Sequence, residues 1–325
     1  MMKTSEEILK LVTDYMASLP YNRQPARLYD PIRYVLSMGG KRIRPSLMLM
    51  AYNLFKDDPQ TVLPQACALE TFHNFTLLHD DLMDNADMRR GHQTVHCRWD
   101  ANTAILSGDT MLIMAFQRMM LCPESLQAPV MRTFIETTLQ INEGQQMDID
   151  FETRDDVREE EYIEMIRLKT SILLACALKI GAIMAGAPAD DVDRLYRFGE
   201  RMGLAFQLQD DFLDVYGDPA TFGKAIGGDI MCNKKTYMLI NALNRASDAQ
   251  AKVLRGWIAA ENPDLGQKIA AVTDLYNQIG VDKLAQQKIE SFFDEARACL
   301  EEVDVEGSRK QVLRDYTDAM MRRNK

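Results

Sequence analysis

The chain has 325 residues, of which 46% are hydrophobic and 26% charged, so it is long enough to bury a large core without disulfides or structural metal ions. Lysine and arginine number 38 against 48 aspartate and glutamate residues, which gives a net charge of −10 and argues against a nucleic-acid-binding protein. With 17 glycines and 11 prolines, the composition also excludes fibrous and low-complexity classes.

The N-terminal residues enter an amphipathic pattern at once, with no apolar stretch typical of a secretion signal. The most apolar segment runs from Ser171 to Ala187 and carries Lys179 in its middle. It is too short and too interrupted for a membrane span and is predicted to be a buried core helix. None of the six cysteines lies close to another in the sequence, so we expect reduced core thiols in a cytoplasmic protein.

Helical periodicity dominates the chain. Apolar residues recur at helical spacing between Ile8 and Met16 and again between Leu195 and Leu208. Long stretches without proline, such as 130–187, suit long helices. Period-two alternation is nearly absent, so we expect no sheet. Glycine, proline or aspartate marks the expected breaks at residues 19–22, 37–40, 56–59, 122–125, 186–188, 217–219 and 261–263. The simplest interpretation is one all-α domain, residues 1–325, with ten or more helices.

Two segments about 130 residues apart each end an apolar helical run with the pattern Asp-Asp-x-x-Asp. The residues concerned are Asp80, Asp81, Asp84, Asp210, Asp211 and Asp214. The first and last aspartates of each motif share a helical face, and their charges repel unless a cation compensates. Oxygen ligands favour Mg²⁺, which takes one or two carboxylates and leaves other positions to water and phosphate oxygens. We therefore expect two facing clusters that hold a Mg²⁺–diphosphate assembly, in preference to two solvated acidic helix ends.

Positive charge follows the same two regions. Lys41 and Arg44, three residues apart, can share a helical face after the Gly39-Gly40 turn. Further cations follow the two aspartate motifs, namely Arg89, Arg90, Lys224, Lys234 and Lys235. His73 lies seven residues before Asp80 on the same face, which suits a diphosphate contact better than a di-iron site, because no second Glu-x-x-His occurs.

This ordered set of motifs resembles the trans-type polyprenyl synthases, the isoprenyl diphosphate synthases, from Gly39 to about Tyr237. The motifs are GGKRIRP, DDLMDNADMRRG, GQQMD, the Lys169-Thr170 pair, FQLQDDFLD, and FGKAIGGDI followed by NKKT. The resemblance implies an orthogonal helix bundle around a central active-site cavity, and a homodimer. Gln93 stands where many members have proline, and Asn233 precedes Lys234 where glycine is usual.

The resemblance also implies roles for individual residues. Three Mg²⁺ ions would grip the allylic diphosphate through Asp80, Asp84 and Asp210, with Asp81, Asp211 and Asp214 as supporting or water-mediated ligands. Isopentenyl diphosphate would be bound by Lys41, Arg44, His73 and Arg90, with Gly40 shaping the turn. The allylic diphosphate would contact Arg89, Lys169, Lys224 and Lys234, and Thr170 and Gln207 would line the path of the carbocation.

The implied reaction is head-to-tail condensation of isopentenyl diphosphate with dimethylallyl, geranyl or farnesyl diphosphate. Phe75 lies five residues before Asp80, with Phe72 one turn deeper, so the two rings can sit side by side below the anchored substrate. Thr76 is small, a pattern similar to archaeal-type geranylgeranyl synthases. We expect a C20 product, with C15 as the alternative, unless the floor comes from another helix or a dimer partner.

Two other functions share the fold. A terpene cyclase binds a single diphosphate and has no use for GGKRIRP, His73 and Arg90. A non-catalytic subunit of a hetero-oligomeric synthase would be expected to have lost an aspartate motif, and both are intact here. The C-terminal segment Met320–Lys325 carries two arginines and a lysine, and it is either a solvated terminus or a flap over bound diphosphate.

Overall fold

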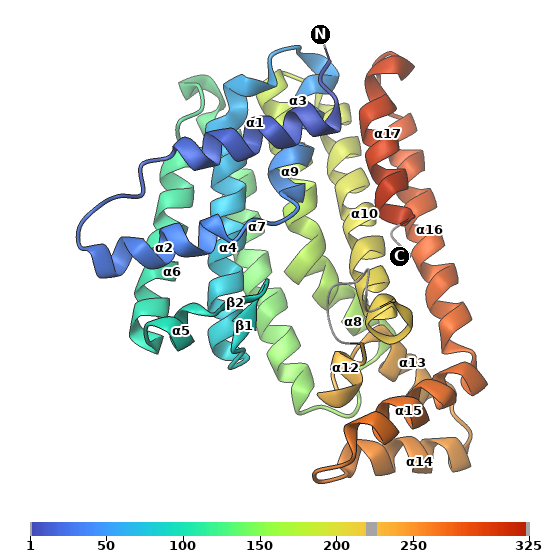
Figure 1. Cartoon of the computed structure of the whole chain (residues 1–325). Coiled ribbons are helices and arrows are strands. Elements are labelled where there is room, and N and C mark those ends of the chain that lie inside the picture. Colours follow the sequence, from blue (N-terminus) through green and yellow to red (C-terminus); the bar gives the residue numbers. More distant parts are fainter. Residues whose placement is uncertain (1, 219–225, 323–325) are drawn as a thin grey trace. The chain divides into compact units, whose positions relative to one another are not determined.

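The structure is a computed structural model that describes residues 2–218 and 226–322 (Figure 1). These residues form more than ten α-helices, and the all-α prediction is confirmed. They divide into two compact units. The first comprises Met1–Ile135, Cys176–Leu195 and Asp304–Leu313, and the second Glu136–Ala175, Tyr196–Val303 and Arg314–Lys325. The single domain and central cavity expected from the sequence stay predictions.

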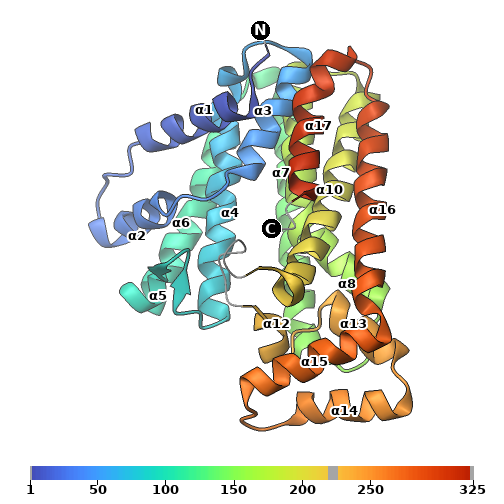
Figure 2. The same ribbon diagram turned by 45° about the vertical axis from the view of Figure 1, so that its right-hand side comes forward.

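The first unit is built around α4 (Leu63–Met83) and α6 (Ala101–Met119), which lie side by side (Figure 1). Two views agree on this pairing (Figure 2). The other elements before α6 are α1 (Ser5–Ser18), α2 (Ala26–Ser37), α3 (Ile43–Phe55), a 3₁₀ turn (Pro59–Val62) and α5 (Val95–Arg98). Most of α4 is buried down to Asp81, so its C-terminal aspartates end a core helix.

The second unit contains α8 (Glu159–Ile166), a π-helical turn (Arg167–Ser171), α12 (Gly228–Met231), α13 (Tyr237–Arg245), α14 (Asp248–Ala259), α15 (Leu265–Ile279) and α16 (Val281–Glu301). Two of these helices, α13 and α14, both pack on α15 (Figure 2). The boundaries between the units fall along α7 (Glu124–Glu152), α9 (Ile172–Ala185), α10 (Ala189–Tyr216) and α17 (Gly307–Met321).

The helices begin where the sequence supplies caps. Thr4 Oγ1 accepts a hydrogen bond from the Glu7 amide at 3.2 Å, and the Glu7 carboxylate accepts one from the Thr4 amide at 2.8 Å. This capping box satisfies two amides at the start of α1. Ser247 and Gln250 form the same arrangement at the start of α14. Each predicted break falls at a helix end, and the predicted N-terminal helix is confirmed as α1.

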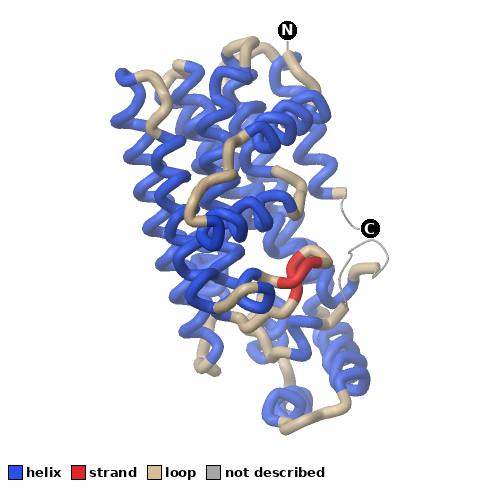
Figure 3. The backbone as a smooth tube through the Cα atoms, turned by 60° about the vertical axis from the view of Figure 1, so that its left-hand side comes forward, coloured by secondary structure: helices blue, strands red, loops and turns tan. Residues whose placement is uncertain are grey.

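The expectation of no sheet is wrong, because a small hairpin follows α4 (Figure 3). Its strands are β1 (Met88–Arg89) and β2 (His92–Gln93), and they pair antiparallel. Arg90 and Gly91 form the turn with φ of 52° and 76°, the left-handed conformation that tight hairpins use. Strands of two residues are too short to produce an alternating pattern, so periodicity could not reveal them.

The apolar segment around α9 behaves as predicted. The most apolar 18-residue window of the continuous stretch Glu159–Ala185 has a mean hydropathy of 1.7, and 78% of that window is buried inside the protein. That burial is typical of a core helix, and no other helix among the described residues reaches the length and hydropathy of a span. All six cysteines are free thiols, as expected, but the expected core location is wrong for Cys97 and Cys232, which are exposed.

Candidate active site

The first aspartate motif ends α4. Asp80 and Asp81 lie in its last turn and Asp84 is its C-cap residue, so the helical spacing predicted for this motif is confirmed. Asp81 is only 6% exposed, and its Oδ1 accepts hydrogen bonds from Arg89 Nε at 2.8 Å and Nη2 at 2.6 Å. Burial raises the pKa of Asp81, while Arg89 acts in the opposite direction. A cation supplied by the chain therefore already offsets the buried charge of this motif.

The hairpin places two cations differently. Arg89, in β1, binds Asp81. Arg90, at the tip, donates through Nη1 to the carbonyl of Gly39 in the turn before α3. Gly40 has φ of 125°, a conformation that other residues rarely adopt, so this position favours glycine, and a Cβ there would stand 2.9 Å from the Arg90 guanidinium. The hairpin thus joins the GGKRIRP turn to the first aspartate motif.

Four arginines lie close enough to act electrostatically on His73, and we call them the arginine cluster: Arg42, Arg44, Arg89 and Arg90. Burial lowers the pKa of His73 well below its ordinary value, and the positive charges of these arginines lower it further. The imidazole is therefore neutral at physiological pH. Concentrated guanidinium groups around a neutral hydrogen-bonding ring are suited to a multiply charged anion.

Within this cluster Arg42 has a structural partner. It is 8% exposed and donates to the buried Glu70 carboxylate at 2.6 Å and to the Leu36 carbonyl at 2.8 Å. Its left-handed backbone makes it the N-cap of α3. Lys41 therefore precedes the helix, and the predicted common helical face of Lys41 and Arg44 is wrong. The positive φ values at Gly39, Gly40 and Arg42 delay the start of the helix.

The second aspartate motif lies on α10 and has different partners. Asp211 is 5% exposed and accepts hydrogen bonds from the Tyr162 hydroxyl and from Gln207 Nε2, the latter at 3.1 Å. Burial, and then the charge of Asp229, raises the pKa of Asp211 to about 7, against the lowering effects of Tyr162, Lys234 and Gln207. Asp214 Oδ2 accepts from the Asp229 amide at 2.9 Å. Asp211 is thus a buried carboxylate with two neutral hydrogen-bond donors and a second carboxylate, Asp229, nearby.

Lys169 and Thr170 lie on the π-helical turn Arg167–Ser171, a local irregularity that is frequent at functional sites. Lys169 Nζ forms an ion pair with Asp148 Oδ2 at 2.6 Å, and Thr170 donates to Gln207 Oε1 at 3.2 Å. A Cβ on Gly144 would stand 2.4 Å from the Lys169 amide nitrogen, so α7 approaches this turn closely. The turn therefore connects two predicted site residues to the second motif.

The donor set fits Mg²⁺. Both motifs offer carboxylate oxygens, and burial, followed by the charge of Asp229, raises the pKa of Asp211, so a bound cation would stabilise its ionised form. Among residues 2–218 and 226–322, no three His, Cys, Asp or Glu side chains form a complete metal-holding group. Mg²⁺ commonly takes one or two carboxylates and fills its other positions with water and substrate phosphate oxygens.

The residues predicted to limit product length, Phe72, Phe75 and Thr76, lie on α4. The ring centroids of Phe72 and Phe75 are 5.5 Å apart, which confirms their predicted side-by-side placement. Phe72 also contacts Phe134, and Phe75 contacts His79 at 4.8 Å. Thr76 Oγ1 donates to the His73 carbonyl at 2.8 Å. An aromatic row therefore runs along the helix that presents the first motif.

The structure gathers the predicted residues within each unit. In the first unit these are Gly40, Arg44, His73, Asp81, Arg89 and Arg90. In the second they are Lys169, Thr170, Gln207, Asp211, Asp214 and Lys234. Lys224 lies outside the described residues. Sequence reasoning missed Tyr162, Asp148 and Asp229; the last two stand inside the quoted motifs GQQMD and FGKAIGGDI, which was the available signal.

Comparisons with known proteins agree on one family. A family model for polyprenyl synthetase matches residues 25–277. A geranylgeranyl diphosphate synthase from Methanosarcina mazei is 42% identical over 232 residues, 70% of each chain. A geranylfarnesyl diphosphate synthase from Natronomonas pharaonis is 34% identical over 322 residues, 93% of this chain and 92% of that one. A solved geranylgeranyl pyrophosphate synthase has a TM-score of 0.94 at 42% identity, with both chains fully covered.

Proposed function

The chain belongs to the polyprenyl synthetase family and is a short-chain prenyltransferase, and on that premise we propose that it condenses isopentenyl diphosphate with allylic diphosphates to an all-trans C20 product. Farnesyl diphosphate, C15, is the alternative product. The allylic primers are dimethylallyl, geranyl and farnesyl diphosphate. The reaction is head-to-tail, so each cycle adds one isoprene unit.

One observation carries this proposal: the arginine cluster around neutral His73, joined to the GGKRIRP turn through Arg90 and Gly39. It offers a place for a diphosphate that depends on guanidinium groups of the chain itself. A terpene cyclase binds only one diphosphate and needs no such cluster. We assign isopentenyl diphosphate to Lys41, Arg44, His73 and Arg90, with Gly40 making room for the Arg90 guanidinium.

We assign the allylic diphosphate to Mg²⁺ ligands on the aspartate motifs. Asp80, Asp84 and Asp210 are the proposed direct ligands of three ions, and Asp81, Asp211 and Asp214 are supporting or water-mediated ones. When bound, Mg²⁺ supplies Lewis-acid stabilisation of the charge that develops on the departing diphosphate. Arg89, Lys169, Lys224 and Lys234 add positive charge there.

The remaining proposed roles belong to side chains near the reacting carbons. Thr170 and Gln207, which are hydrogen-bonded to each other, line the path of the allylic carbocation. Apolar surroundings exclude water that would trap this cation. The double bond of isopentenyl diphosphate attacks it, and the released diphosphate accepts the proton that leaves. Phe75 and Phe72 form the floor that stops elongation.

We also propose that the protein is a homodimer. Leu106 and Ile113 of α6 and its C-cap residue Met120 are 58%, 60% and 50% exposed and recur every seven residues, so they share one face of the helix. Exposed apolar side chains gathered on one face support an interface there. The free thiols suit the reducing cytoplasm, where we expect the enzyme.

The function is tested by incubating the pure protein with Mg²⁺, isopentenyl diphosphate and each allylic primer, then sizing the dephosphorylated products. A C20 alcohol is expected from every primer. A hydrocarbon formed without isopentenyl diphosphate would favour the cyclase. An inactive protein that gains activity only with a second chain would favour the non-catalytic subunit.

A further inference from the structure

The turn between α12 and α13 carries Lys234, and its backbone is unusual at the preceding residue. Asn233 has φ of 55°, in the left-handed region that glycine adopts without strain and asparagine tolerates. The Lys234 amide donates to the Asp229 carbonyl at 2.9 Å, and the Thr236 amide donates to the Lys234 carbonyl at 2.8 Å. The position of Lys234 therefore depends on how Asn233 is held.

Lys268, on α15, holds this turn. Its Nζ donates to Asn233 Oδ1 at 2.6 Å and to the Met231 carbonyl at 3.1 Å. Asn233 Nδ2 in turn donates to the Ile258 carbonyl at the end of α14, also at 3.1 Å. The asparagine side chain is thus fixed from α14 and from α15. A glycine at this position could make neither contact.

Burying the ammonium group of Lys268 costs desolvation free energy, so we expect its contacts to have a specific role. The residue is only 3% exposed, and burial lowers the pKa of its ammonium group. Apolar side chains, among them Leu254 and Val272, line the same small pocket. Among the described residues no carboxylate forms an ion pair with Lys268, and its hydrogen-bond partners are neutral oxygens of the turn. An apolar side chain of similar length would avoid the desolvation cost but could not hold the turn.

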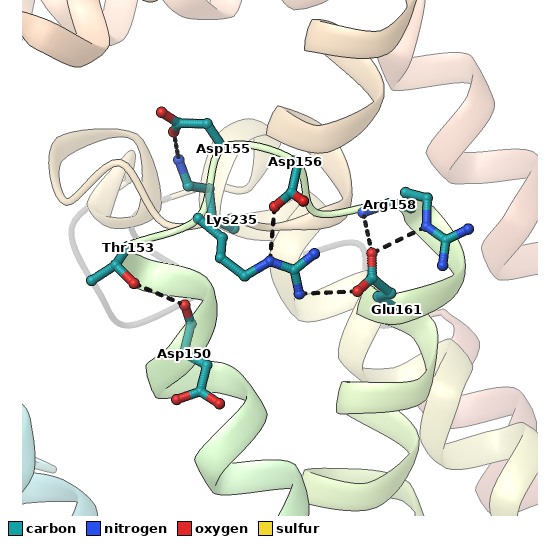
Figure 4. A network of polar contacts seen from close by, with 8 residues as sticks. Asp150, Thr153, Asp155, Asp156, Arg158, Glu161 and Lys235 are labelled. Carbon is teal, nitrogen blue, oxygen red and sulfur yellow. Dashed lines mark hydrogen bonds and ion pairs between the residues drawn. The ribbon is translucent and has the colours of Figure 1, made fainter.

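The other flank of Lys234 is held much more weakly. Lys235, whose side chain is 9% exposed, forms an ion pair with Asp155 at 2.9 Å, and the Asp155 side chain is 94% exposed (Figure 4). An ion pair with a solvent-exposed carboxylate contributes little to stability because water competes for that charge. The buried contacts of Lys268 are therefore the stronger constraint on the turn.

The turn that carries Lys234 is tied to the second aspartate motif through Asp229. The Asp229 amide donates to Asp214 Oδ2 at 2.9 Å, and the Asp229 carbonyl accepts from the Lys234 amide at 2.9 Å. Lys234 therefore lies close enough for its charge to act on Asp211 as well. A change in the turn would move this charge relative to Asp211.

We propose that Lys268 is a positioning residue for the allylic diphosphate, which acts through Asn233 to hold Lys234 toward the second aspartate motif. This inference rests on the function proposed above, because Lys234 is assigned there to that diphosphate. In this chain Asn233 and the buried Lys268 together fix the turn before Lys234, which a glycine at position 233 would leave flexible.

The test compares Lys268→Met, which keeps the length of the side chain, with the surface control Asp155→Ala. Lys268→Met should raise KM for farnesyl diphosphate by about fivefold to tenfold, less than the loss of a direct charged contact because Lys268 acts through Lys234, and leave KM for isopentenyl diphosphate within about twofold. Asp155→Ala should change neither. Circular dichroism and thermal melts establish that each variant is folded. Equal changes in both KM values, or none, in folded Lys268→Met would overturn the proposal.

A double-mutant cycle tests whether Lys268 acts through Asn233. Asn233→Gly should itself raise KM for farnesyl diphosphate, and adding Lys268→Met should then have little further effect, since the two residues form one unit. Fully additive effects would contradict this route. The cycle also replaces the single variant if Lys268→Met does not fold alone, because Asn233→Gly relieves the left-handed strain.

Binding of inorganic diphosphate with Mg²⁺, measured by calorimetry, separates this inference from the proposed function. Weaker binding to Lys268→Met than to wild type supports the inference, even if wild type makes no prenyl product and the proposed function fails. Unchanged diphosphate binding together with normal wild-type prenyl transfer sinks the inference alone.

Discussion

The two Asp-Asp-x-x-Asp motifs share their spacing, yet their middle aspartates have different surroundings. Asp81 accepts two hydrogen bonds from the guanidinium of Arg89, a charged partner. Asp211 is held by the neutral side chains of Tyr162 and Gln207, and burial beside Asp229 raises its pKa to about 7. The middle aspartate of the first motif is therefore paired with a charged side chain, whereas the middle aspartate of the second has neutral hydrogen-bond donors and the charge of Lys234 nearby. Identical motifs do not guarantee identical electrostatics, because partners distant in sequence decide them.

The largest expected effect comes from removing a direct metal ligand. Asp80→Ala and Asp210→Ala should each lower kcat by more than about 100-fold, since even residues that only orient metal ligands are worth roughly 10–100-fold. Excess EDTA should abolish wild-type turnover. Steady-state kinetics with farnesyl diphosphate provides the measurement, and full activity in excess chelator would refute the metal assignment for both motifs.

Variants of the cationic residues should distinguish the binding site of isopentenyl diphosphate from that of the allylic diphosphate. Arg90→Ala and Lys41→Ala remove charged contacts worth about 1.5–3 kcal/mol each, so KM for isopentenyl diphosphate should rise roughly 10- to 150-fold. Lys169→Ala should act instead on the allylic substrate. Equal changes in both KM values across these three variants would show that the two-site assignment is wrong.

The surroundings of the middle aspartates predict a smaller difference in stability. Arg89→Met leaves the buried Asp81 carboxylate without its cation and should destabilise the protein by about 1–3 kcal/mol. Tyr162→Phe removes one hydrogen bond from a carboxyl group that is partly protonated near neutral pH, which should cost about 0.5–1.5 kcal/mol. Urea unfolding at pH 7 measures both. A larger loss in Tyr162→Phe would reverse the contrast between the motifs.

The smallest effect should be on product length, with little change in overall rate. If the Phe75 ring is the floor below the first motif, Phe75→Ser should lengthen the product beyond C20, and Thr76→Phe should shorten it toward C15. Chromatography of the dephosphorylated alcohols gives the distribution. Should both variants keep the wild-type pattern, the floor lies on another helix or on a dimer partner.

Much of the fold could be predicted from sequence, because helical periodicity and turn residues act locally. The end of α4 at the first motif and the buried helix α9 followed from such local signals. The hairpin at Arg90-Gly91 did not, since two-residue strands leave no pattern. Nor did the late start of α3, which depends on a left-handed residue at Arg42.

The site residues that were missed act through contacts between segments far apart in the sequence. Tyr162 reaches Asp211 across 49 positions, and Lys268 reaches Asn233 across 35. Neither residue type is unusual in its own segment, so only the three-dimensional arrangement assigns it a partner. By contrast, the aspartate motifs can be recognised from the sequence because like charges recur on one helical face within an apolar run.

The central claim is that the chain's own cations bind one diphosphate and Mg²⁺ is needed for the other. Calorimetry with isopentenyl diphosphate and with a non-hydrolysable farnesyl thiodiphosphate, each with and without Mg²⁺, tests it most directly. Isopentenyl diphosphate should bind in EDTA with an affinity that Arg90→Ala weakens, whereas the farnesyl analogue should bind only when Mg²⁺ is present. If both ligands required Mg²⁺, or if both bound equally well in EDTA, the distinction between the two diphosphate sites would be contradicted.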